Sequence, residues 1–238
     1  MKLDILAFGA HPDDVELGAA ATIAKEVSLG KKVGIIDLTQ GELGTRGSKE
    51  LRKIEATKAA NILGVAIREN LKFADGFFIN DKMHQLEVIK RIRKYKPEIA
   101  ICNAVDDRHI DHGKGSKLVS DACFLSGLQK IETDFEGEKQ EKWRPKLVYH
   151  YMQWKNTEPD FVVDVSGFID IKMEAVLAYS SQFYDPNSKE LETPISSKNF
   201  TDSIQYRARE LGRLIGVNHA EGFTVERSIA VTSLDKLI

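Results

Sequence analysis

The chain has 238 residues, of which 42% are hydrophobic and 29% charged, and its formal net charge at pH 7 is −2. Its length and composition predict a single α/β domain over residues 1–238, with a core large enough to need no disulfide staples. The balanced charge excludes a general attraction to nucleic acid or membrane surfaces, and no apolar segment approaches the roughly 20 residues of a membrane span.

The N-terminus and the cysteines indicate the compartment. The N-terminal apolar run is short and is followed at once by charges, so we expect no signal peptide. Cys102 and Cys123 lie in apolar contexts and are not spaced as a metal pair. We expect buried free thiols in a reducing environment, and therefore a cytoplasmic protein.

In the first half of the chain, short apolar runs alternate with segments of helical periodicity. The predicted strands and helices, in chain order, are 3–8, 15–29, 33–38, 49–63, 70–73, 84–95, 98–103 and 114–125. This alternation predicts a Rossmann-like, mainly parallel sheet flanked by helices on both faces. The glycine fingerprint of dinucleotide-binding proteins is missing, so no dinucleotide is expected.

The second half is expected to add strands and helices to the same core. The predicted strands are 146–152, 161–165 and 223–231, and the predicted helices are 169–181 and 201–215. The polar segment 129–144 predicts a surface excursion, and 185–199 predicts a loop that is either a lid or an oligomer contact. His150 is expected in the core or at an interface, and a structural role is favoured for His219 over one near the active site.

The first cluster of chemically active residues follows the first strand. His11, Asp13 and Asp14 lie between this strand and the helix that begins near Val15. Ligands bind at this carboxyl edge in open α/β sheets, and ionisable groups are costly there unless they bind something. His11 and Asp14 suit a divalent metal such as zinc, and Asp13 is then a spare carboxylate placed to act as a general base. The alternative is that Asp13 or Asp14 only caps the helix.

A second cluster follows the strand at 98–103. Residues 106–113 read DDRHIDHG and hold two histidines, with a carboxylate between them. Because parallel strands end at one edge of a sheet, His112 can complete the metal set begun by the first cluster. His109 is then a second imidazole near the metal, and Asp111 can orient a histidine. The alternative is a polar surface loop that happens to hold two histidines.

A glycine-rich loop and the helix after it carry arginines near the same edge. Residues 39–47, TQGELGTRG, form either a mobile surface turn or a substrate-binding loop, and they include Arg46. In the helix at 49–63, Arg52 and Glu55 share one face, which by itself predicts a solvated ion pair.

These motifs resemble a known family. AHPDDVELG and DRHIDHG together resemble the PIG-L (LmbE-like) family of zinc-dependent N-acetylglucosaminyl deacetylases. The wider pattern, with DLTQGELGTRG followed by LRKIEA and later RPKLVYHYM, is similar to the bacillithiol-biosynthesis branch, whose members deacetylate N-acetylglucosaminyl malate. The chain departs from many members at Ile110, where they have proline.

The resemblance implies an amide hydrolase that removes the acetyl group from an N-acetylglucosaminyl conjugate. Zn²⁺ would be held by His11, Asp14 and His112, although iron or cobalt suits the same ligands. Asp13 would be the general base, and a protonated His109 would stabilise the oxyanion.

The substrate and the assembly follow from the resemblance in the same way. It implies that Arg52 binds the substrate, and the two carboxylates of malate make Arg46 and Arg108 further candidates. It also implies a homo-oligomer, a trimer or hexamer. Two alternatives stay open: a deacetylase of another acetylated amino sugar, such as a chitin disaccharide or an antibiotic precursor, and a metal-binding module without turnover.

Overall fold

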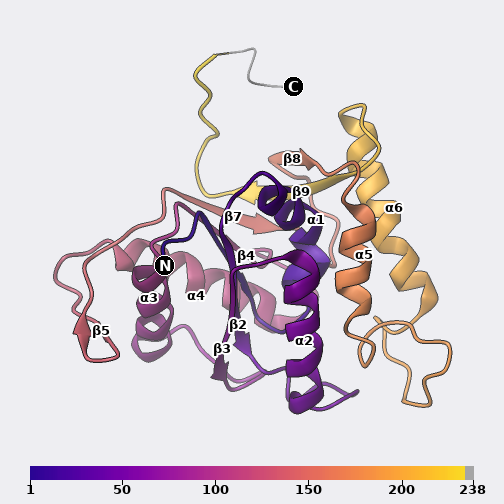
Figure 1. Cartoon of the computed structure of the whole chain (residues 1–238), viewed down its shortest axis with the longest axis horizontal. Helices are drawn as coiled ribbons and strands as arrows, with labels where there is room; N and C mark the ends of the chain where they lie inside the picture. Colours follow the sequence, from indigo (N-terminus) through magenta and orange to yellow (C-terminus); the bar gives the residue numbers. More distant parts are fainter. Residues whose placement is uncertain (234–238) are drawn as a thin grey trace.

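The fold is built on one seven-stranded sheet with the strand order β3-β2-β1-β4-β7-β9-β8 (Figure 1). The computed structural model describes residues 1–233. The strands of this sheet are β1 Ile5–Gly9, β2 Val33–Thr39, β3 Ile67–Phe73, β4 Ile99–Cys102, β7 Leu147–Tyr151, β8 Phe161–Asp164 and β9 Ala220–Val225. The helices are α1 Asp14–Ser28, α2 Lys49–Leu63, α3 Lys82–Tyr95, α4 Ile110–Ser126, α5 Ile169–Leu177 and α6 Lys198–Leu214.

The first five strands of the sheet order are parallel, and β9 runs antiparallel to both β7 and β8. The prediction of a mainly parallel, Rossmann-like sheet with added C-terminal elements is therefore confirmed. Helices α3 and α4 cover one face of the sheet, whereas α1, α2 and α5 cover the other (Figure 1).

Both faces of the sheet are buried, as β1 shows. Ile5 and Ala7 point into the apolar cluster under α1, α2 and α5, and Leu6 and Phe8 point into the cluster under α3 and α4. This alternation follows from the two-residue period of a strand, and burial on both sides explains why β1 is continuously apolar. This packing fixes the position of the strand ends, and therefore of the polar residues that follow them.

Three boundaries in the first half and middle of the chain differ from the prediction by three residues or more. Helix α4 begins at Ile110 and not at 114, because the His109 side chain caps it by accepting from the Asp111 backbone N–H. Strand β3 begins at Ile67 and not at 70, because its charged residues pair with β2 at the sheet edge. Helix α5 ends at Leu177 and not at 181.

The C-terminal boundaries differ as well. Strand β9 covers Ala220–Val225, whereas the prediction was 223–231, because β7 and β8 pair with it only over those residues. Helix α6 begins at Lys198, since Ser197 caps it, and this shortens the predicted 185–199 loop. The polar segment 129–144 holds a small hairpin, β5 Asp134–Phe135 and β6 Glu138–Lys139.

Two further expectations can be compared with the structure. Cys102 and Cys123 are both buried and free, as predicted. Over residues 1–233, no helix is long and apolar enough to cross a membrane.

Candidate active site

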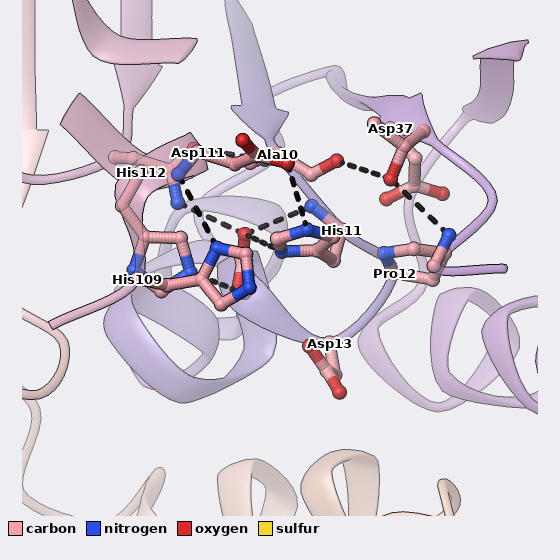
Figure 2. Close-up of polar contacts among 12 residues, drawn as sticks. Ala10, His11, Pro12, Asp13, Asp37, His109, Asp111 and His112 are labelled. Atoms are coloured by element: carbon pink, nitrogen blue, oxygen red, sulfur yellow. Dashed lines mark hydrogen bonds and ion pairs between the residues drawn. The ribbon is translucent and has the colours of Figure 1, made fainter. Parts of the chain in front are cut away.

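The two polar motifs meet at the carboxyl edge of the sheet. Strands β1 and β4 pair in parallel, so the turn after β1 and the start of α4 lie side by side. Figure 2 shows the rings of His109 and His112 gathered beside His11, with Asp13 further along the turn. The centroid of the His11 ring lies 4.6 Å from that of His109 and 5.7 Å from that of His112.

Asp14 lies between His11 and His112. Its Oδ1 is 3.2 Å from His112 Nε2, and its Oδ2 is 3.5 Å from His11 Nδ1. The same carboxylate accepts from the His11 backbone N–H at 2.9 Å, from Asn103 Nδ2 at 3.0 Å and from Gln153 Nε2 at 2.5 Å. Burial acts to raise the pKa of Asp14, but His112 and His11 hold it well below its usual range.

His11 and His112 are each fixed by a carboxylate on the ring nitrogen that points away from Asp14. His112 Nδ1 lies 2.7 Å from Asp107 Oδ2, and His11 Nε2 lies 2.9 Å from Asp75 Oδ1. Burial lowers the pKa of His112, but Asp14 and Asp107 raise it to about 9. Carboxylates in this position orient metal-binding imidazoles and raise their basicity.

Asp75 and Asp107 are site residues that were not predicted from the sequence. Asp107 lies within the second motif, in the turn between β4 and α4, where the sequence pattern indicated Asp111 as the orienting carboxylate. Asp75 follows the end of β3, at the same sheet edge, and that position was the signal that could have identified it.

The donor atoms fit a divalent cation. Ligand atoms of His11, His109 and His112 lie within 4.8 Å of one another, and so do those of His11, Asp75 and Asp111. The second group is already engaged, because Asp111 accepts from the Gly76 N–H at 2.7 Å and from a lysine at 3.1 Å. The imidazoles of His11 and His112 face the buried Asp14 carboxylate, and a second carboxylate holds the other nitrogen of each ring. This donor set matches the ligand chemistry of zinc and related metals.

His109 adopts a defined tautomer. Its Nδ1 accepts from the Asp111 N–H at 3.2 Å, so a neutral ring carries its hydrogen on Nε2. Burial lowers the pKa of His109, and the neighbouring His11 and His112 lower it further. The structure therefore favours a neutral ring that donates from Nε2, in place of the protonated ring expected from the sequence.

Asp13 lies beside the candidate metal-binding group of His11, Asp14 and His112. Its backbone has φ 111°, a conformation that Asp and Asn adopt more readily than most residues, and its side chain is buried. Arg52 Nη2 donates to Asp13 Oδ2 at 2.8 Å, and the same arginine bonds the Pro12 carbonyl and Gln182 Oε1. Burial raises the pKa of Asp13 to about 7, against the lowering effect of Arg52.

These groups open into a cavity of about 280 Å³. Its wall includes Trp154 and Phe200, whose rings stack with centroids 5.3 Å apart. The guanidinium carbon of Arg108 lies 4.4 Å above the Trp154 ring at the same wall. Sequence reasoning found no aromatic platform, because Trp154 follows β7 while Phe200 lies in α6, and only the fold brings them together.

The three candidate arginines occupy different positions. Arg52 and Arg108 line the cavity, whereas Arg46 is not among its lining residues within 1–233. Arg46 is buried and donates to Ser188 Oγ at 2.5 Å and to Glu190 Oε2 at 3.4 Å. It thus joins the glycine-rich loop to the loop that precedes α6.

The two motifs that form this site also lie in the region that matches a known protein family. Residues 6–123, which span both motifs, match the family model PIG-L, GlcNAc-PI de-N-acetylase. The chain belongs to the PIG-L family. The PIG-L match ends within α4, so the Trp154 and Phe200 side of the cavity comes from the part of the chain beyond it.

Three relatives describe the breadth of similarity. Diacetylchitobiose deacetylase of Thermococcus kodakarensis is 29% identical over 189 residues, which cover 75% of this chain and 70% of that protein. Mycothiol S-conjugate amidase of Streptomyces coelicolor is 28% identical, over 63% of this chain and 60% of that protein. The crystal structure of the conserved protein TT1542 from Thermus thermophilus has a TM-score of 0.86 and 33% identity, over 98% of both chains.

Proposed function

We propose that this PIG-L protein is a zinc-dependent hydrolase that removes the acetyl group from an N-acetylglucosaminyl conjugate, with N-acetylglucosaminyl L-malate of bacillithiol biosynthesis as the substrate. One observation carries the chemistry. A buried His11–Asp14–His112 group shares its cavity with Asp13, a carboxylate that stays outside that group. A passive metal-binding site would not need this additional base, so turnover is favoured over a module that only binds metal.

His11, Asp14 and His112 would hold the metal. When bound, it supplies a Lewis acid and lowers the pKa of a water molecule that it holds. Asp13, with a pKa of about 7, takes the proton of the attacking water and later gives it to the leaving amine. Arg52 keeps the Asp13 carboxylate in place during both transfers.

The remaining groups act on the acetamide. The Nε2–H of His109 donates to the developing oxyanion, and one such donor is worth roughly 3 kcal/mol in comparable sites. Water adds to the carbonyl carbon and the C–N bond then breaks. The products are acetate and a free glucosamine amine.

Two features of the cavity wall support a sugar conjugate that carries negative charge. The stacked Trp154 and Phe200 rings offer an apolar surface of the kind against which a sugar ring packs. Among the described residues, the Arg108 side chain donates to no protein acceptor, so its planar fork is free for the carboxylates of malate.

A chitin disaccharide is the second candidate, favoured by the similarity to diacetylchitobiose deacetylase. The test is to measure acetate release from N-acetylglucosaminyl malate, diacetylchitobiose and free N-acetylglucosamine with wild type and Arg108→Gln. We expect Arg108→Gln to raise KM for the malate conjugate and to leave the neutral sugars unchanged. Arg144→Gln is the matched control, because Arg144 also lies over an aromatic ring, 4.3 Å from Phe124, but outside this cavity.

Turnover of diacetylchitobiose alone would move the assignment to the second candidate, and release from none of the three by metal-loaded protein would contradict both. The homo-oligomer and the cytoplasmic location expected from the sequence stay predictions, to be checked by light scattering and by cell fractionation.

A further inference from the structure

His150 lies in a polar cluster behind the candidate active site. It is on β7, and its side chain is only 3% exposed. Its Nδ1 lies 3.0 Å from the Asn103 carbonyl oxygen, 2.8 Å from Ser116 Oγ and 3.3 Å from Cys102 Sγ. Its Nε2 lies 3.1 Å from Oε1 of Glu226, the residue that follows β9.

The partners of His150 define its charge. The Asn103 carbonyl and the ionised Glu226 carboxylate can only accept hydrogen bonds, so these two contacts favour a hydrogen on each ring nitrogen, and the Ser116 hydroxyl can also accept from Nδ1–H. Burial lowers the pKa of His150, but Cys102, Glu226 and the Asn103 carbonyl raise it to about 11. His150 is therefore a buried imidazolium whose counter-ion is Glu226.

Asn103 connects this cluster to the candidate metal site. Directly after β4, its Oδ1 accepts from the Ala10 N–H at 2.8 Å, and its Nδ2 donates to Asp14 Oδ2 at 3.0 Å. The same Nδ2 is 3.2 Å from Gln153 Oε1, and Gln153 also donates to Asp14. The position of the Asp14 carboxylate therefore depends on where Asn103 is held.

We propose that His150 and Glu226 are positioning residues: the imidazolium, held by Glu226, fixes Asn103 and through it the Asp14 carboxylate. This inference rests on the proposed metal site. It assigns a role to two residues that line no part of the substrate cavity. It also makes the geometry of the site depend on the end of β9, where the Glu226 side chain is 39% exposed.

The first test measures zinc affinity by competition with a chromophoric chelator. Partners one step outside a metal's ligands are typically worth about 10- to 100-fold in affinity, and His150 acts one step further out. We therefore expect the Kd for zinc to rise about tenfold in His150→Leu and by less in His150→Gln, which keeps a donor for the Asn103 carbonyl. Glu226→Ala, a change at a partly exposed position, is expected to weaken zinc binding in the same direction.

The matched control is Arg93→Met. Arg93 is another buried cation that holds backbone carbonyls, those of Ser126, Leu128 and Ile131, but it lies on α3 away from the site. We expect Arg93→Met to lower thermal stability and leave the Kd for zinc unchanged. An unchanged Kd in folded His150→Leu and Glu226→Ala would overturn the proposal.

A second test separates this proposal from the proposed function. ¹⁵N NMR of the metal-free wild type at pH 7.5 is expected to show His150 protonated on both nitrogens, and His150→Leu is expected to shift the Asn103 side-chain amide. A neutral His150 ring, or an unshifted Asn103 amide, would overturn the positioning role. A wild-type protein that binds no zinc but gives the expected NMR result would instead contradict the metal site and leave the His150–Asn103 connection established.

Discussion

Asp13 can be tested with little change in shape, by Asp13→Asn. Asparagine also tolerates the φ of 111° and keeps a side-chain oxygen that accepts from Arg52, so the turn should stay intact. The carboxylate that takes the water proton is lost. A positioned general base contributes about 10²- to 10⁴-fold in rate, which corresponds to roughly 3–5 kcal/mol of transition-state stabilisation.

The Asp13 pKa predicts how the activity depends on pH. Asp13 acts only when ionised, and with a pKa of about 7 it becomes protonated as the pH falls, so activity is present above this range and is lost below it. A bound cation adds positive charge nearby, so the acid limb of kcat/KM should lie no higher than about pH 7. Arg52→Gln removes a charge that lowers the Asp13 pKa, so it should move this limb to higher pH.

The assay is acetate release over pH 5–9 by proteins of known zinc content. We expect Asp13→Asn to bind zinc like wild type and to lose at least about a hundredfold in kcat/KM. His112→Ala is the contrasting variant, since it should lose zinc. Near-normal turnover by zinc-loaded Asp13→Asn would refute the assignment of the base, and loss of zinc from it would show that Asp13 belongs to the metal site.

Three further predictions follow from single contacts. Asp107→Asn should weaken zinc binding about 10- to 100-fold in a chelator competition, because the carboxylate 2.7 Å from His112 Nδ1 is lost; an unchanged Kd would argue against its orienting role. Gly18→Ala should lower the unfolding free energy by about 1–3 kcal/mol in urea titrations, since the new methyl carbon would overlap the Tyr151 ring; wild-type stability would mean that the tyrosine ring moves freely. Trp154→Leu should raise KM for amino-sugar substrates more than it lowers kcat, and a fall in kcat with KM unchanged would place Trp154 in the chemical step instead.

The sheet and the approach of the two motifs could be predicted because both depend on local patterns. Nearly continuous apolar runs such as 3–8 are typical of strands buried on both faces, and parallel strands must end at one edge. This was enough to place His11, Asp14 and His112 in one region. It also identified Asp13 as a carboxylate near that region.

The rest depended on tertiary contacts that leave no local signal. Trp154 and Phe200 come from elements that meet only through the packing of α6. The end of β9 at Val225 is set by its neighbours, because the next residues have no strand to pair with in the described sheet. The neutral tautomer of His109 follows from its capping of α4, which the prediction started four residues later.

Chelator-sensitive acetate release tests the central claim most directly. Purified protein is incubated with N-acetylglucosaminyl malate and with free N-acetylglucosamine, before and after removal of metal, and again after zinc is restored. The proposed function predicts fast release from the malate conjugate that disappears without metal, returns with zinc and exceeds release from the free sugar. Release that persists at full rate in protein shown to be free of metal would contradict the role proposed for His11, Asp14 and His112.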